Sequence, residues 1–281
     1  MCKFISKAWI LGSNVAFLAA TIFIVDAAAQ TTGSVPDFSS NRTAWQTPNG
    51  TDFIPVPGSP SPVTNDPAHP YISNGVANRT GQQPTYRISD LTNLNLKQWA
   101  KDIMRKDNDE VLAGKIAYTP SSSCKPAGVP AIMLSGGPFY FVQTPKEVLL
   151  IAEGERIARR IYMNVPHSAN VKPSWYGESV GRYEGGTLVV DTIGLNDKTF
   201  VDNYRTPHTE KLHVIERWRL IDGGKTLEVH ITVNDPDTFN QPWQVLRRYN
   251  RVQAVLGEEI CQEGNFILFD YGIPVADKLD F

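Results

Sequence analysis

The feature that most constrains the fold is a series of short apolar or alternating runs between residues 131 and 251, separated by turn-forming residues. Runs of this length and spacing are typical of β-strands joined by tight turns. Because an open antiparallel sheet exposes two edges, such a sheet must close on itself or pack against a second sheet. We therefore predict an all-β fold, a lipocalin-like antiparallel β-barrel, with a β-sandwich as the alternative. The predicted strands are 131–135, 139–143, 147–152, 157–163, 178–184, 187–192, 212–220, 226–234 and 243–251.

The segments before the strands differ in character. Residues 1–29 have a basic start, an apolar run and the small-residue sequence Ala27-Ala28-Ala29, which predicts a cleaved signal peptide and a periplasmic or secreted protein, with a retained membrane anchor as the alternative. Residues 30–90 carry eight prolines between Pro48 and Pro84 and predict an extended arm. Apolar residues at helical spacing predict one short helix at 93–107. The domain 91–281 would hold this helix and the barrel.

The charge balance argues against some partners. Of 27 basic and 29 acidic residues, the signal holds two and one, which leaves 25 and 28. A chain with this slight negative excess is not expected to bind nucleic acid. After the signal, no segment approaches the ~20 apolar residues of a membrane span. We expect a small-molecule ligand or substrate as partner, and nothing in the sequence indicates an oligomeric state.

Two cysteines remain after the signal is removed, Cys124 and Cys261. They flank the predicted β-region, and export places them in an oxidising compartment. A disulfide between them is therefore predicted, with two free buried thiols as the alternative.

The Gly185-Gly186 pair suits a two-residue hairpin turn, since both positions of such a turn often need positive φ. Pairing the two flanking strands places ionisable and apolar side chains on one common face. Two readings stay open for that face, a polar pocket within the barrel and a solvated surface ion cluster. The residues of this face are Glu178, Val180, Arg182, Val189 and Asp191.

The run 212–220 places Glu216 on an otherwise apolar face, with Leu212, Val214 and Trp218. A carboxylate in such a position needs a partner or titrates at a raised pKa. We predict that Glu216 points inward and meets a cationic or hydrogen-bonding group, with Arg182, His167 and His208 as the expected partners. The alternative is a buried Glu with a purely structural role.

Histidines add two candidates for proton transfer. His167 follows a strand, and His208 lies in the polar loop 193–211, and a loop histidine near a core carboxylate is a reasonable general acid or base. Each is also explained by an ordinary hydrogen-bonding role. No sequence signature of a zinc protease, P-loop, dinucleotide fold or nucleophile elbow is present, so we predict no cofactor and assign no metal ligand. A metal site built from His167, His208 and an acidic residue is the alternative, which the spacing does not support.

The chain resembles a large group of secreted or periplasmic bacterial proteins, mostly of unknown function. The resemblance covers roughly residues 118–267 and is carried by the segments CKPAGVP (124–130), QTP (143–145), RIYM (160–163), WYGESVGRYEGGTLVVDT (175–192), PHTEKLHVIERWR (207–219) and EEICQEGN (258–265). Members frequently have His at position 178, where this chain has Glu. The resemblance implies export and one β-domain, and it implies no particular reaction.

By analogy of fold alone, small lipocalin-like barrels include cofactor-independent enzymes such as phenolic acid decarboxylases. The first hypothesis is therefore a cofactor-independent lyase or decarboxylase acting on a small aromatic or hydrophobic molecule. Its expected catalytic residues are Glu216, His208, Asp191 and His167, and its expected substrate-binding residues are Arg182, Glu178, Tyr176 and Trp175. The alternatives are a non-catalytic ligand-binding barrel and a structural envelope protein.

Overall fold

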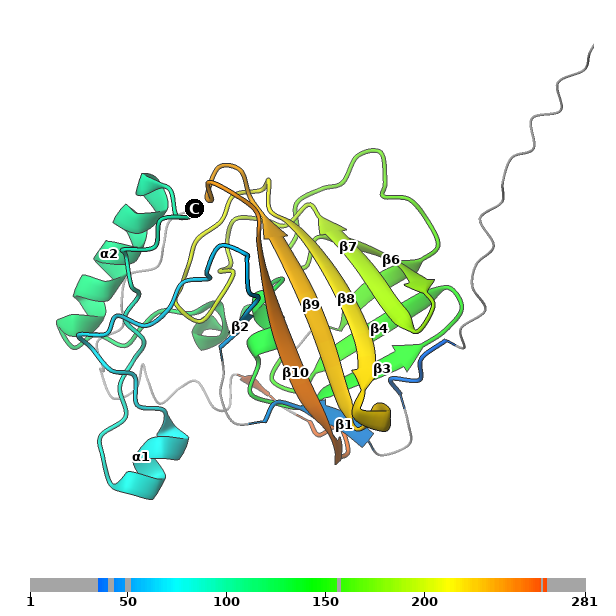
Figure 1. Ribbon diagram of the computed structural model, residues 1–281, viewed down its shortest axis with the longest axis horizontal. Helices are drawn as coiled ribbons and strands as arrows, with labels where there is room; N and C mark the ends of the chain where they lie inside the picture. The colour runs from blue at the N-terminus through cyan, green and yellow to red at the C-terminus, as the bar shows by residue number, and fades with distance from the viewer. Residues whose placement is uncertain (1–34, 40–42, 49–51, 156–157, 259, 262–281) are drawn as a thin grey trace, which may run out of the picture. The chain divides into compact units, whose positions relative to one another are not determined.

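A computed structural model describes residues 35–39, 43–48, 52–155, 158–258 and 260–261. The predicted signal peptide lies outside these residues. The described chain forms a ten-stranded sheet, of which nine strands close into a barrel (Figure 1). The predicted all-β barrel is thus confirmed. Its strands are β1 (Thr43–Gln46), β2 (Ile54–Pro55), β3 (Phe139–Gln143), β4 (Glu147–Ala152), β5 (Arg159–Met163), β6 (Glu178–Glu184), β7 (Thr187–Ile193), β8 (His213–Ile221), β9 (Thr226–Asn234) and β10 (Trp243–Gln253).

A strand of the arm, β1, closes the barrel by lying between β3 and β10. Strand β1 pairs along its whole length with β10 and meets β3 at Trp45 and Phe139. The short strand β2 adds to β10 at a separate place, where Leu246 faces Ile54. The arm therefore supplies the strand that closes the barrel. This strand was not predicted, because prolines disfavour strands and the arm is rich in proline.

The β6–β7 hairpin has the predicted register. Glu184 pairs with Thr187, Arg182 with Val189 and Val180 with Asp191. The turn begins at Gly185 in the left-handed region, at a φ of 58°, which glycine adopts without steric cost.

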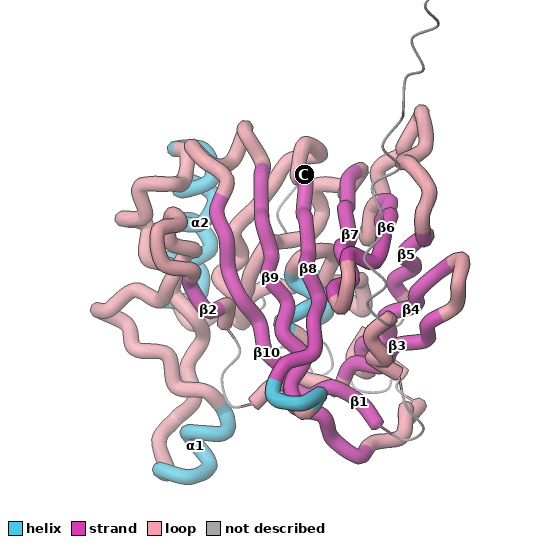
Figure 2. The backbone as a smooth tube through the Cα atoms, turned by 45° about the vertical axis from the view of Figure 1, so that its right-hand side comes forward, coloured by secondary structure: helices cyan, strands magenta, loops and turns pink. Residues whose placement is uncertain are grey.

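Strands β8 to β10 form the longest continuous part of the sheet (Figure 2). Their alternation buries large rings at the barrel centre: Trp218 packs against Phe141 at 5.5 Å between centroids and against Tyr249 at 6.1 Å. Phe139 meets the other side of Tyr249 at 5.1 Å. Burial of each phenylalanine stabilises the fold by roughly 1.5–3 kcal/mol. The interior is thus filled with side chains.

One predicted strand is wrong, and so is the predicted direction of one strand pair. Residues 131–134 form the 3-10 helix η2 (Ala131–Leu134) instead of a strand, and Ile132 to Leu134 are all buried. The sheet is also not wholly antiparallel, because β5 and β6 run parallel, with Ile161 opposite Ser179. A short continuous apolar run does not separate a strand from a buried helical turn. The connection 164–177 between β5 and β6 is long enough to return the chain in the same direction.

Helix α2 (Gln98–Leu112) begins later than predicted, and a second helix, α1 (Asn74–Thr80), lies inside the arm. The late start has a local cause. Leu96 forms a bridge with Phe239, and the side chain of Asn95 bonds the backbone of Gln241, so this segment is extended. Helix α2 then lies beside the barrel (Figure 1) and buries Ala100 and Met104.

The predicted disulfide between Cys124 and Cys261 is present, with Cα atoms 5.7 Å apart. It joins residues separated by 137 positions. Cys124 ends the 3-10 helix η1 (Pro120–Ser123), and Cys261 follows β10. The bond therefore ties the segment before the barrel to the segment after it, and it indicates a non-cytoplasmic compartment.

Replacing both cysteines by serine should lower the free energy of unfolding by roughly 4 kcal/mol, because the unfolded chain regains the entropy of a long open loop. Urea unfolding of the oxidised protein and the double variant would measure the difference. Equal midpoints, or two reactive thiols in the denatured, unreduced protein, would contradict the bridge.

Candidate functional site

The barrel interior holds a buried ion pair between Arg159 of β5 and Glu216 of β8. The guanidinium donates two hydrogen bonds to the carboxylate, Nη2 to Oε1 at 2.7 Å and Nη1 to Oε2 at 3.0 Å. Both side chains are fully buried, with 0% exposure. A bidentate pair is the geometry in which attraction best offsets the cost of removing two charges from water.

Neighbouring strands supply the remaining hydrogen bonds of this pair. Arg159 donates to the hydroxyls of Ser179 on β6, at 3.1 Å, and Thr192 on β7, at 2.8 Å. The indole Nε1 of Trp218 donates to Glu216 Oε2 at 2.8 Å. The charged groups are therefore enclosed by donors and acceptors of the protein. Such a fully satisfied network is typical of a buried ion pair that rigidifies the core.

The inward direction of Glu216 is confirmed, but the predicted partners are wrong. Arg159, which the sequence interpretation overlooked, takes the place expected for Arg182, His167 or His208. A signal was present, since Arg159 shares the inward face of its strand with Ile161 and Met163. An arginine on the apolar face of one strand is a natural ion-pair partner for a carboxylate on the apolar face of another strand.

Arg182 does not face the barrel interior, so its expected role inside a barrel pocket is wrong. Its side chain is 58% exposed and binds Glu184, which also binds Arg217. The inner face of the hairpin is the other one, with Ser179 and Thr192 at the ion pair. An alternating hairpin shows two faces, and its pattern alone did not identify the buried one.

Three of the predicted residues do come together, on the outer face of the hairpin. The Nδ1 atom of His167 lies 3.0 Å from Glu178, and its Nε2 atom lies 3.1 Å from Asp191. His213, which was not predicted, lies 2.8 Å from the same Asp191 oxygen. Two donors of Ser168 also bind Glu178 and hold its pKa below the usual range, Ser168 Oγ being the larger cause. The cluster fastens the 164–177 connection to the sheet.

The other predicted residues lie apart from one another. His208 is buried, with Nε2 2.7 Å from the Thr199 hydroxyl and Nδ1 3.0 Å from the Thr209 carbonyl. Burial lowers the pKa of His208, so this histidine is a neutral structural group. Trp175 lies 6.0 Å from the ammonium of Lys125, and the Tyr176 hydroxyl donates to Glu155 at 2.8 Å.

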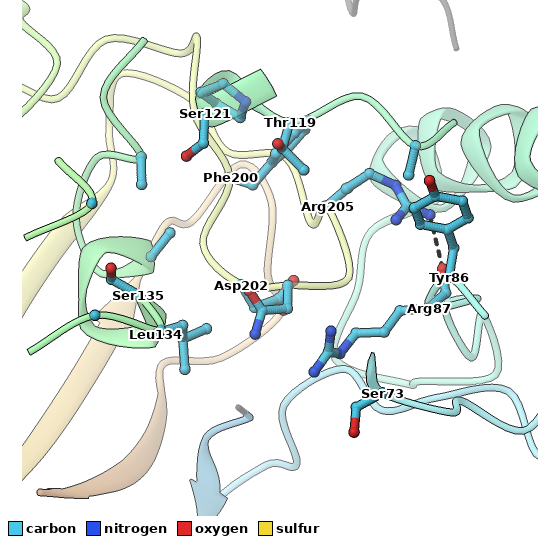
Figure 3. Close-up of a pocket in the computed structure, with 18 of the residues that line it drawn as sticks. Ser73, Tyr86, Arg87, Thr119, Ser121, Leu134, Ser135, Phe200, Asp202 and Arg205 are labelled. Carbon is cyan, nitrogen blue, oxygen red and sulfur yellow. Dashed lines mark hydrogen bonds between the residues drawn. The ribbon is translucent and has the colours of Figure 1, made fainter. Parts of the chain in front are cut away.

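Glu155 also lines a cleft of about 1130 Å³. Five separate parts of the chain line it: the arm, the segment around η1, the η2 region, the end of β4 and the loop between β7 and β8 (Figure 3). Most of the residues that line the cleft are polar or aromatic. The lining includes the charged and aromatic residues Tyr71, Tyr86, Arg87, Glu153, Glu155, Asp202 and Arg205, together with Gly136.

The β7–β8 loop, residues 194–212, supplies a buried carboxylate of the cleft, Asp202. Asp202 accepts hydrogen bonds from the backbone of Tyr204 and Thr206 and from the Thr206 hydroxyl. Burial nevertheless raises the pKa of Asp202 to about 6, and the nearby Asp52 contributes in the same direction. A carboxyl group that titrates near neutrality beside a cavity is a typical feature of functional sites.

The same loop is fastened to helix α2. Arg205 adopts a left-handed φ of 60°, and its Nε donates to Asp107 at 2.6 Å, in a pair that is almost fully buried. Its Nη2 donates to the Arg87 carbonyl at 3.1 Å, as Figure 3 shows. A non-glycine residue in this region is strained, and here the buried pair offsets the strain.

Comparison with protein families, with curated proteins and with solved structures finds no match for this chain. Among the residues that the structure describes, no group of three or more histidine, cysteine or acidic side chains is arranged to hold a metal ion. None of the described helices has both the length and the apolar character of a membrane span.

Changing Glu216 to Gln should lower the free energy of unfolding by roughly 3–5 kcal/mol, because it leaves the Arg159 charge buried without a counter-charge. Urea unfolding would measure this. Glu184→Gln is the matched control, since Glu184 also pairs with arginines but on the surface, and its loss should be below about 1 kcal/mol. Equal effects of the two changes would contradict the structural role of Glu216.

The raised pKa of Asp202 predicts a second, pH-dependent effect. The folded protein holds this proton more tightly than the unfolded chain, so its stability falls as the pH rises from about 4 to about 6. Asp202→Asn removes this titration and keeps an acceptor oxygen for the backbone amides of Tyr204 and Thr206. Relative to the unchanged protein, the variant should gain roughly 1–3 kcal/mol between pH 4 and pH 7. A stability difference that does not vary with pH would contradict the raised pKa.

Proposed function

We propose that this protein is a periplasmic or secreted ligand-binding barrel protein, and that the cleft holds its small-molecule ligand. The observation that carries the proposal is the convergence of five separate chain segments on one cavity of about 1130 Å³. Ligand sites are typically concave and carry a few well-placed polar groups. Long connections such as the β7–β8 loop are also commonly functional.

The filled barrel interior supports the cleft as the binding site. Arg159 and Glu216 are fully buried, and each charged group is enclosed by donors or acceptors of the protein. A ligand inside the barrel would have to displace this network and the aromatic rings packed around Trp218. The geometry therefore favours binding at the barrel end over chemistry at Glu216.

Export is supported by two independent features. The Cys124–Cys261 bridge fits an oxidising compartment, and the first 29 residues have the composition of a signal peptide. A ligand of an exported protein would be a molecule of the cell envelope or of the surroundings.

An acid–base enzyme acting in the same cleft is the second candidate. Asp202 favours it, because a carboxyl group with a pKa of about 6 is suited to exchange protons near neutral pH. The two candidates differ in one outcome. After incubation with a bound compound, a binding protein returns the compound unchanged, whereas an enzyme converts it, and mass spectrometry of the compound separates these results.

Blocking the cleft should abolish ligand binding without unfolding the protein. Gly136 lines the cleft, and a Cβ atom added there meets nothing within 4 Å, so Gly136→Trp should place an indole ring at the cleft and obstruct it. The measurement is thermal unfolding with a panel of saccharides, aromatic acids, amines and short peptides. A bound compound at a hundredfold excess over its Kd should raise the Tm of the unchanged protein by roughly 5–10 °C and that of the variant by none.

Gly186→Trp is the matched control. Gly186 lies at the tip of the β6–β7 hairpin, and a Cβ atom there also meets nothing within 4 Å. This variant should respond to the ligand like the unchanged protein. A ligand that stabilises Gly136→Trp as strongly as the control would show that the cleft is not the binding site.

A further inference from the structure

Two carboxylates of the cleft receive hydrogen bonds from neutral donors. Glu153 accepts from the Tyr140 hydroxyl at 2.9 Å, and desolvation, followed by this contact, raises the pKa of Tyr140 to about 12. Asp202 accepts from backbone amides and a hydroxyl of its own loop. Among the described residues these two carboxylates are bound by neutral donors, so their negative charges oppose the binding of an anion.

The two guanidinium groups of the cleft already have acidic partners. Arg87 Nε donates to Asp52 at 3.0 Å, and Arg205 Nε donates to Asp107 at 2.6 Å. A phosphate or carboxylate ligand would have to compete with these aspartates. The electrostatics thus favour a ligand that is neutral or positively charged.

The remaining walls of the cleft combine apolar side chains, such as Leu134 and Phe200, with polar ones that a purely apolar ligand would leave without partners. Burying carboxylates and hydroxyls under hydrocarbon would cost free energy because their hydrogen bonds to water would not be replaced. A ligand with many hydroxyl groups replaces those bonds, since each hydroxyl both donates and accepts. The hydroxyl and amide side chains that line the cleft are Ser73, Asn74, Thr85, Thr119, Ser121, Ser135 and Asn203.

Aromatic rings on the arm side complete the set of contacts. Tyr86 lines the cleft and is 47% exposed. Tyr71 also lines the cleft, with the Arg87 guanidinium 3.9 Å from its ring centroid. The apolar face of a pyranose ring packs well on such a tyrosine, while the hydroxyls at its edge reach polar neighbours.

From these contacts we infer that the ligand is a short saccharide chain, neutral or amino-bearing, which stacks one ring on Tyr86 and directs hydroxyl groups to Glu153 and Asp202. This inference rests on the proposed function of the cleft. The volume of about 1130 Å³ exceeds that of typical drug-sized sites, so it holds more than one sugar ring.

Isothermal titration of the full mature chain with four tetrasaccharides tests the inference. The probes are maltotetraose, cellotetraose, chitosan tetramer and tetragalacturonate. At least one of the first three should bind, and the anionic tetragalacturonate should bind at least about tenfold more weakly or not at all. Gly136→Trp should abolish the binding, Gly186→Trp should keep it, and Tyr86→Ala should weaken it about tenfold through loss of the stacked ring.

The outcomes separate this inference from the proposed function. If no tetrasaccharide binds, or only the anionic one does, while another compound binds in a manner sensitive to Gly136→Trp, the saccharide inference fails and the cleft remains a binding site. If saccharide binding survives Gly136→Trp, both fail. If Tyr86→Ala leaves the affinity unchanged, the stacked pose is wrong.

Discussion

The bidentate ion pair between Arg159 and Glu216 joins four neighbouring strands of the barrel. Arg159 belongs to β5 and Glu216 to β8, and the guanidinium also binds Ser179 on β6 and Thr192 on β7. The group thus crosses the seam where β5 and β6 run parallel, the one place where the antiparallel order of the described strands is interrupted. A buried ion pair stabilises the fold only when all of its hydrogen bonds are formed. Because these bonds reach four strands, they require one register between those strands.

The position of the binding site follows from this core. With the interior filled by the ion pair and the rings around Trp218, a ligand must bind outside the barrel wall or at its end. The arm, the η1 and η2 regions and the β7–β8 loop gather at one end and enclose the cleft. The buried Arg205–Asp107 pair and the Cys124–Cys261 bridge hold these segments in place. A rigid barrel therefore carries a site built mainly from loops, as is common in β-proteins.

Local pattern predicted much of the barrel and little of the site. The Gly185-Gly186 turn fixed the hairpin register, and alternation placed Glu216 inward, because both depend on residues close in sequence. Alternation within its strand could place Arg159 inward, but its pairing with Glu216 was missed because the two residues lie 57 positions apart and no local pattern links them. The inner face of the hairpin was undecided for a similar reason, since only the neighbouring strands determine which face is covered.

The cleft could not be predicted from local sequence patterns. Its residues come from stretches between Tyr71 and Arg205 that have no common periodicity, and only the folded chain brings them together. Among the predicted site residues, Tyr176 reaches the cleft lining, through its hydrogen bond to Glu155. Glu178 and Asp191 were predicted on one hairpin face and His167 separately as a proton-transfer candidate, and the contact between them, which fastens a connection to the sheet surface, was not predicted.

A double-mutant cycle at Arg159 and Glu216 tests the central claim most directly, using Arg159→Met and Glu216→Gln, singly and together. If the pair organises a packed, ligand-free interior, each single change leaves a buried charge unbalanced, and the double variant should lose at least about 2 kcal/mol less than the sum of the two single losses. Urea unfolding of the four proteins gives these free energies. Losses that add within about 0.5 kcal/mol would show that the two charges do not depend on each other, and would contradict the account.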